Sequence, residues 1–129
     1  MRIRVQSLLV FVFLCGFGQF AQSDPLPGGG GNYLGFSKGS PTAQTGGVDV
    51  SVDQKPTTGY TCTKITIRVI DNTTGMTLGT YTENNPGGSV SKSFTGLGSN
   101  REIQVPAAAT FQSGATFDPK HIMTSLTTK

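Results

Sequence analysis

Cys62 is the side chain best suited to covalent chemistry, because it is the only cysteine after the apolar N-terminal stretch. The two-residue spacing of a strand places Cys62 on one face with Lys64, Thr66 and Arg68. The ammonium of Lys64 would favour the thiolate there, and an exposed odd cysteine in an exported protein predicts an intermolecular disulfide. The alternative is that Cys62 lies under a loop at the strand end as a small apolar residue.

Asn72-Thr73-Thr74 is an acceptor sequence for N-glycosylation. It lies within residues 71–75, whose Asp, Asn, Thr and Gly favour a turn, so we expect Asn72 to be exposed. Glycan attachment needs a eukaryotic secretory pathway. Asn72 is therefore predicted as a glycosylation candidate.

The remaining polar residues do not form a pattern typical of a catalytic or metal site. Asp49 and Asp53 share one strand face but are separated by roughly 13 Å, which is too far for both to bind one calcium ion. His121 is the only histidine, in a loop-like context near the C-terminus, where we expect it to be solvated. Neither Glu83 nor Glu102 has an apolar setting that would raise its pKa for acid catalysis. We expect no enzyme activity, catalytic residue, cofactor or metal.

Residues 1–23 have the pattern of a signal peptide. Arg2 and Arg4 precede an apolar run from Leu8 to Phe17, and Ala21-Gln22-Ser23 places small residues at the cleavage site. No later segment contains the roughly 20 apolar residues that a transmembrane helix needs. The sequence predicts a secreted, extracellular protein (periplasmic in a bacterium), without a transmembrane segment in the mature chain.

Composition argues against some classes of partner. The leader arginines account for two of the three net positive charges, so the mature chain is nearly neutral, with scattered basic residues. We therefore expect no nucleic-acid binding. Carbohydrate binding is weakly supported, because the chain has three tyrosines but no tryptophan for a stacking platform. A protein partner or self-association is the favoured expectation.

Residues 24–46 are rich in Gly, Pro and Ser and include four consecutive glycines. Such a composition buries little apolar surface, so a flexible segment is expected. Tyr33, Leu34 and Phe36 are the exception. They favour, as the alternative, a docking peptide or an added strand.

From residue 47 onward the apolar residues alternate with polar ones, as in half-buried strands. The predicted strands cover residues 48–52, 61–70, 76–83, 89–95, 101–105 and 107–117, separated by turns rich in Gly, Pro and Asn. The predicted inward residues of the first, second and fifth strands are Val48, Val50, Val52, Ile65, Ile67, Val69, Ile103 and Val105. Residues 47–118 are thus expected to form an all-β antiparallel sandwich of six or seven strands, followed by a C-terminal segment over 119–129.

The segment Ser91 to Val105 resembles the corner between the fifth and sixth strands of fibronectin type III and related immunoglobulin-like domains. Gly96-Leu97 ends one strand, and Ile103 stands six residues beyond Leu97, where those domains carry a tyrosine. The resemblance implies a sandwich of a class used for adhesion, spacing and binding. Ile103 lacks the hydroxyl of that tyrosine, so its hydrogen bond to the backbone cannot form.

These observations predict a secreted, non-enzymatic β-sandwich module with a structural, adhesion or binding role. Its partner surfaces are expected at the sheet face of Lys64, Thr66 and Arg68 and at the Gly-rich N-terminal segment. Strand edges with few charges also favour self-association. The alternative is a small secreted effector, such as a toxin, antimicrobial or inhibitor, acting on a foreign target.

Overall fold

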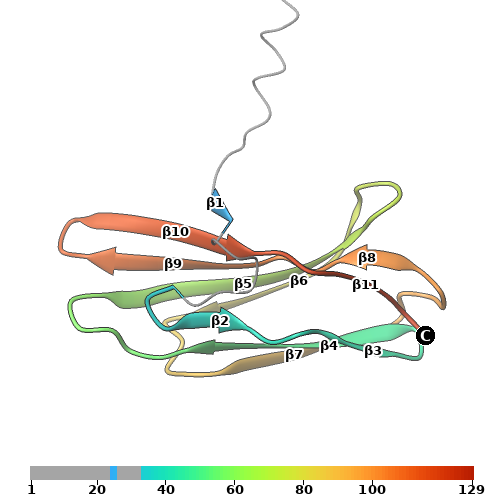
Figure 1. Ribbon diagram of the computed structural model, residues 1–129, viewed down its shortest axis with the longest axis horizontal. Helices are drawn as coiled ribbons and strands as arrows, with labels where there is room; N and C mark the ends of the chain where they lie inside the picture. Colours follow the sequence, from blue (N-terminus) through green and yellow to red (C-terminus); the bar gives the residue numbers. More distant parts are fainter. Residues whose placement is uncertain (1–23, 26–32) are drawn as a thin grey trace, which may run out of the picture.

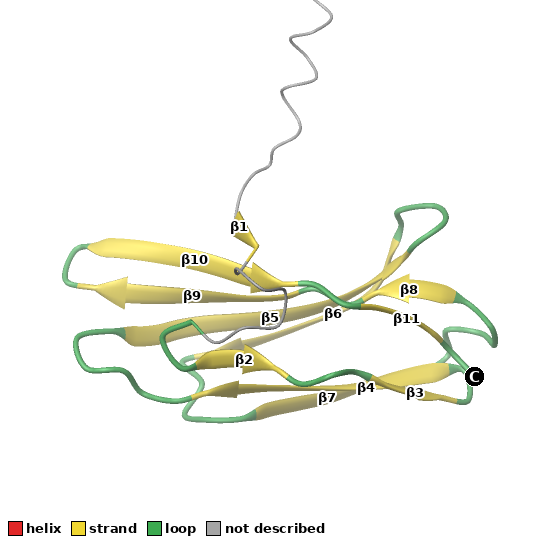
Figure 2. Cartoon of the chain, viewed as in Figure 1, coloured by secondary structure: helices red, strands yellow, loops and turns green. Residues whose placement is uncertain are grey.

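The alternating segments form two packed β-sheets, seen edge-on in Figure 1 and coloured by element type in Figure 2. The computed structural model describes residues 24–25 and 33–129, so the predicted leader over 1–23 lies outside the described residues. Within that described part, no helix is long and apolar enough to cross a membrane. The strands are β1 Asp24–Pro25, β2 Phe36–Lys38, β3 Thr42–Gln44, β4 Gly47–Gln54, β5 Thr61–Asp71, β6 Thr77–Asn84, β7 Val90–Phe94, β8 Glu102–Gln104, β9 Ala107–Ser113, β10 Thr116–Ile122 and β11 Ser125–Thr127.

The smaller sheet is centred on β4. Strands β2 and β3 pair antiparallel with successive parts of one side of β4, and β7 pairs antiparallel with its other side. The segments β2 and β3 therefore act as one interrupted strand. This sheet has three rows, in the order β2/β3, β4, β7.

The larger sheet is centred on β5. Strand β6 pairs with one side of β5, and β9 and β8 pair with successive parts of its other side. Strands β10 and β11 extend the sheet beyond β9 and β8, and the backbone of β1 pairs in parallel with β10. Apart from the two-residue β1, the two sheets have seven rows, three of which are interrupted. The first five predicted strands correspond to β4 to β8, whereas the β2/β3 row was not among the predicted strands.

The core lies between the sheets and contains the inward residues predicted for the first, second and fifth strands. Each of these side chains is at most 2% exposed. Leu97 is also buried, so both positions that carry the immunoglobulin-like resemblance, Leu97 and Ile103, face the core. The two-residue alternation therefore predicted the positions of the central apolar side chains correctly, because each inward position is buried by the opposite sheet.

The prediction of a flexible segment through residue 46 is wrong for residues 36–46. Strands β2 and β3 lie in this segment, and the Phe36 side chain is fully buried with an edge-on contact to Phe111. The sandwich therefore begins before residue 47, and the added strand that Phe36 suggested is correct. Burying a large aromatic side chain offsets much of the entropy lost on ordering a short polar segment.

Gly35 lets this segment approach β4. Its backbone has a φ of +82°, and the amide of Lys55 donates to its carbonyl over 3.0 Å. A Cβ atom at this position would lie 2.2 Å from the carbonyl oxygen of Lys55. Only glycine combines this φ with so close a contact between backbones.

The C-terminal part also differs from the prediction. Residues 107–117 form no single strand, because the chain turns after β9 and returns as β10, which leaves Phe117 60% exposed. Residues 119–129 belong to the sandwich through β10 and β11, and Ile122 is buried in the core. Gly114, with a φ of +59°, lies in the tight turn that the period-two pattern did not reveal.

Candidate functional site

Cys62 faces the core, so its predicted outward orientation is wrong. Along β5 and β9, Cys62 pairs with Phe111 whereas Lys64 pairs with the next residue, Thr110, so one extra residue bulges between them. An extra residue in one strand moves the side chains that precede it to the opposite face of the sheet. Cys62 is 7% exposed, and burial raises the pKa of its thiol. This geometry fits the alternative of a small apolar residue and removes the basis for an intermolecular disulfide.

The other members of the predicted face do lie on the outer side of β5. Lys64 and Arg68 are exposed and Thr66 is half-buried, while Ile65, between them in the chain, is fully buried. The hydroxyl of Thr66 lies 3.4 Å from the hydroxyl of Thr82 on the neighbouring strand β6. The predicted face is therefore continuous with β6, where the larger sheet ends.

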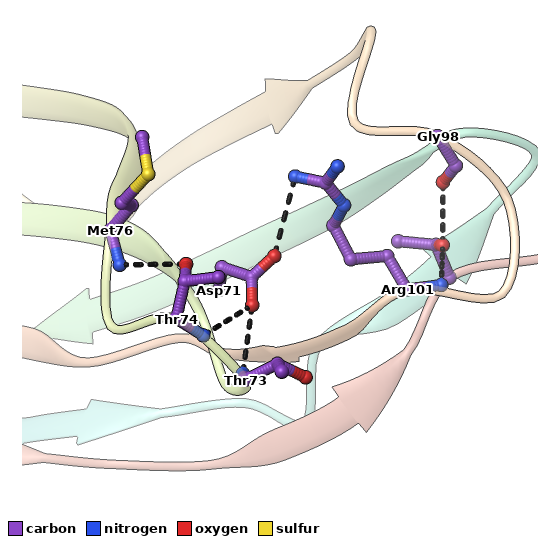
Figure 3. Close-up of polar contacts among 7 residues, drawn as sticks. Asp71, Thr73, Thr74, Met76, Gly98 and Arg101 are labelled. Atoms are coloured by element: carbon purple, nitrogen blue, oxygen red, sulfur yellow. Dashed lines mark hydrogen bonds and ion pairs between the residues drawn. The ribbon is translucent and has the colours of Figure 1, made fainter.

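The turn from β5 into β6 is built on the carboxylate of Asp71 (Figure 3). Its Oδ1 accepts hydrogen bonds from the amides of Thr73, at 2.7 Å, and Thr74, at 2.9 Å. The amide of Gly75 donates to the backbone carbonyl of Asp71, and Gly75 has a φ of +79°. Asn72 lies on this turn with an exposed side chain, as expected, and its glycosylation stays a prediction.

A second contact joins this turn to the loop before β8. Arg101 Nη1 lies 3.5 Å from Asp71 Oδ2, and the Arg101 amide donates to the buried hydroxyl of Thr128. The amides of Thr74 and Thr73, and to a lesser degree Arg101, hold the pKa of the Asp71 carboxyl below its ordinary value. The ionised carboxylate thus holds the turn that sets the start of β6.

The ladder between β5 and β6 determines which backbone groups of β6 remain available. The amide of Asn85 donates to the carbonyl of Thr63, and the register pairs Ile65 with Glu83. In an antiparallel ladder, hydrogen-bonded and non-hydrogen-bonded pairs alternate, so Glu83 and the residues in phase with it bond to β5. The amides and carbonyls of the intervening residues, Thr80, Thr82 and Asn84, therefore point away from β5.

No described strand pairs with that free side of β6. Strand β6 is eight residues long and carries one charged side chain, Glu83, and no proline. The free backbone groups of Thr80, Thr82 and Asn84 form what we call the β6 edge. Such an edge is a template for pairing with another chain.

Three inward side chains line the rim of the sandwich beneath the β6 edge. Tyr81 pairs across β5 with Ile67, and its hydroxyl donates to Glu83 Oε1. Lys92 reaches from β7 so that its Nζ lies 5.2 Å from the centre of the Tyr81 ring. The hydrogen bond to Glu83 raises the pKa of Tyr81. We call Tyr81, Glu83 and Lys92 the rim cluster.

Sequence reasoning missed both the β6 edge and the rim cluster. The low charge of residues 77–84 was a visible signal, since long edge strands usually carry lysine or proline. That β6 is an edge strand depends on the pairing of β5 with β9 and β8 on its other side. Those pairings join segments far apart in the chain, so no local pattern revealed them.

The other sheet edges are shorter or interrupted. Strand β10 contains Pro119 and is paired with β1, and β7 has five residues. The β2/β3 row is interrupted at residues 39–41. Prolines and interruptions are the devices that discourage strand addition, so β6 is the least protected edge among the described strands.

The carboxylates of β4 bind neighbouring side chains on the smaller sheet. Asp49 accepts from Gln44, at 2.9 Å, and from Ser93, at 2.7 Å, while Asp53 accepts from Ser89. A hollow of about 360 Å³ lies beside Asp49, lined by Ser40, Thr42, Asp49, Val50, Ser51, Ser91, Lys92 and Ser93. Its lining is rich in hydroxyl groups and contains no aromatic ring, so carbohydrate binding gains little support.

The remaining polar candidates lie around β10. His121 belongs to this strand and is half-buried, rather than solvated in a loop. Tyr33 donates to Asp118, packs edge-on against Phe111 and has its ring 5.1 Å from Lys120 Nζ. Over residues 33–129 and the short β1, no three His, Cys, Asp or Glu residues gather in a group that could hold a metal ion.

Comparisons with known proteins give no relative: no family model, no curated protein and no solved structure matches the chain.

Proposed function

We propose that the chain is a secreted, non-enzymatic β-sandwich module that binds an extended segment of a polypeptide by adding it as a strand along β6. The observation that carries this proposal is the β6 edge, where Thr80, Thr82 and Asn84 direct amides and carbonyls away from β5. Main-chain hydrogen bonds supply the affinity in this mode of recognition, and side chains beside the edge supply the specificity.

Recognition rather than catalysis is supported by the way the acidic side chains are used. Asp49 is bound by Gln44 and Ser93, and Asp71 by turn amides. The buried thiol of Cys62 has a raised pKa, which disfavours the nucleophilic thiolate. These groups stabilise the sandwich, and the β6 edge offers its free polar groups to a partner.

We also propose that the module is related to fibronectin type III and immunoglobulin-like domains. Three observations support this. A three-row sheet packs on a sheet that has four rows apart from the two-residue β1, and β6, the fourth row along the chain, pairs with β5, the third. Leu97 and Ile103 are both buried in the core. Export by a leader over residues 1–23 belongs to the same proposal. It fits a module that meets its partner outside the cell.

Two substitutions of one residue test strand addition. In Thr82→Pro the outward amide is lost while the ladder to β5 is kept, because proline is tolerated at an edge strand position whose N–H faces solvent. Thr82→Val keeps that amide and the β-branched shape, and so serves as the matched control. Both variants should unfold at a denaturant midpoint close to that of the unsubstituted chain.

A displayed library of extended peptides would be selected on the unsubstituted chain and measured against both variants. We expect selected peptides to bind the chain and Thr82→Val alike, to lose at least tenfold in affinity for Thr82→Pro, and to slow amide exchange at Thr80, Thr82 and Asn84. Peptides that bind Thr82→Pro equally well, or a selection that yields no binder, would overturn the proposal.

A further inference from the structure

We propose that the strand added at β6 is β6 of a second copy of this chain, so that two larger sheets join into one across a twofold axis. This inference rests on the proposed function and names its partner. The argument comes from the backbone register of β6 and from the charges of the rim cluster.

The twofold register is set by the outward residues. Antiparallel pairing centred on Thr82 places Thr82 opposite the same residue of the second copy and Thr80 opposite Asn84. Because all three residues direct their amides and carbonyls outward, each of these pairs is of the hydrogen-bonded kind. Threonines directly opposite one another are also favourable cross-strand neighbours. A C₂ interface needs a self-complementary surface of this kind.

The same register brings opposite charges together. Tyr81 of one copy lies opposite Glu83 of the other, on the inner side of the joined sheet. Since Lys92 Nζ lies 5.2 Å from the Tyr81 ring, the ammonium of one copy comes next to the carboxylate of the other. The twofold axis repeats this Lys92–Glu83 contact. Two copies are therefore complementary in backbone and in charge.

Steric factors at the edge favour the same pairing. Strand β6 has no proline, and its one charged side chain is Glu83. In this register Glu83 of one copy lies opposite Tyr81 of the other copy, and the two Glu83 side chains do not face each other. The outward-facing side chains of the joined strands are Thr82 at the axis and Thr80 opposite Asn84, and all of them are small enough to lie side by side. No like charges face each other across the joined strands.

A cysteine trap tests the register. In a Cys62→Ala background, Thr82→Cys places two thiols across the axis in a hydrogen-bonded pair, where Cα atoms about 5.5 Å apart allow a disulfide. Thr80→Cys is the matched control, because its two copies are offset by four residues, or about 13 Å. We expect mild oxidation to cross-link Thr82→Cys as a dimer and to leave Thr80→Cys monomeric. Cross-linking of Thr80→Cys and not Thr82→Cys would overturn the register and with it the proposal.

A charge exchange tests the contact between copies. Glu83→Lys and Lys92→Glu should each weaken the dimer about tenfold, because like charges then meet twice across the axis. An equimolar mixture of these two variants should recover the dimer, since every contact then joins opposite charges. An effect within one chain would not be rescued by mixing. Lys64→Glu, which changes a charge on the outer face of β5, is the control and should dimerise normally.

Sedimentation velocity over a concentration series provides the readout. A concentration-dependent dimer with recovery on mixing supports the proposal. A chain that stays monomeric at all concentrations while selected peptides still bind at β6 would overturn the second copy as partner and leave strand addition intact. If the chain is monomeric and the selected peptides bind Thr82→Pro as tightly as the unsubstituted chain, both the second copy as partner and strand addition at β6 would be overturned. An association unaffected by Thr82→Pro and by both charge variants would place the interface elsewhere and overturn this inference.

Discussion

The side-chain nitrogen of Lys38 lies 2.7 Å from Thr124 Oγ1, and this contact ties the edge of the smaller sheet to the link between β10 and β11. Lys38 is 8% exposed, on the same inward face of β2 as the buried Phe36. Burial lowers the pKa of Lys38 from 10.5 to about 8. A lysine in this setting costs stability whenever it is charged.

Lys38→Met should therefore stabilise the fold at neutral pH. Below pH 8 both states carry the proton, and the folded state bears the full cost of a buried ammonium. Between pH 8 and pH 10.5 the unfolded chain binds more protons, so the free energy of unfolding of the unsubstituted chain should rise with pH. We expect Lys38→Met to gain on the order of 1–3 kcal/mol at pH 7 and to lose this dependence.

Urea unfolding at pH 7 and at pH 10 measures both effects. Lys55→Met is the control, because Lys55 is exposed and its substitution should leave the unfolding midpoint nearly unchanged. A Lys38→Met variant less stable than the unsubstituted chain at pH 7 would show that the Thr124 contact outweighs the burial cost.

Asp71→Asn should destabilise the turn between β5 and β6 in a pH-dependent manner. The pKa of Asp71 is lowered in the fold, so its stabilising effect is present above the ordinary value of 3.8 and is lost as pH falls through the lower folded value. The difference between Asp71→Asn and the unsubstituted chain, measured by urea unfolding, should shrink at acidic pH. Arg101→Gln should cost less than Asp71→Asn, because the amides of Thr74 and Thr73 lower the pKa more than Arg101 does. The opposite ranking would assign the turn's stability to the ion pair.

Gly79→Ala should destabilise the packing of β6 over β7. A Cβ atom at Gly79 would lie 2.8 Å from Cδ1 of Phe94, a buried ring, so either the ring or the strand must move. We expect a loss of about 1–3 kcal/mol in the free energy of unfolding. Gly87→Ala is the matched control, because an added Cβ meets nothing within 4 Å there. Equal stability of the two variants would mean that the Phe94 ring can move aside without a loss in the free energy of unfolding.

Cys62 should be unreactive in the folded chain. Its thiol is 7% exposed and its pKa is raised by burial, so an aromatic disulfide reagent should modify it only after unfolding in urea. Lys64→Cys supplies an exposed thiol on the same strand for comparison and should react at once. Electrophoresis without reductant should show a monomer band under oxidising preparation. A reductant-sensitive dimer would show that the thiol of Cys62 is exposed and would contradict its burial.

Several features of this fold were predictable from local pattern. Alternation through residues 48–52 and 65–69 gave the inward faces of β4 and β5, because each strand keeps one register there and the inward positions are covered by the opposite sheet. The turn at residues 71–75 followed from side chains that bond to their own backbone. The outward positions of Lys64 and Arg68 followed from the same period.

The candidate site, by contrast, depends on pairings between distant segments. Cys62 was misplaced because one bulged residue before Lys64 reverses parity, and the bulge exists only relative to β9. Residues 36–46 form strands despite a composition typical of flexible segments, because the Phe36 side chain packs in the core beside Phe111.

The sequence by itself determined the alternation along β4 and β5, the turn at residues 71–75 and the burial of the apolar side chains of 48–52 and 65–69, since these depend on neighbours within a few residues. Tertiary structure alone decided that β6 lies at an edge with Thr80, Thr82 and Asn84 directed outward, and that Lys92 meets Tyr81 at the rim. A strand has the same local sequence pattern in the middle of a sheet and at its border. Only the order in which strands pair leaves one set of backbone groups without a neighbour.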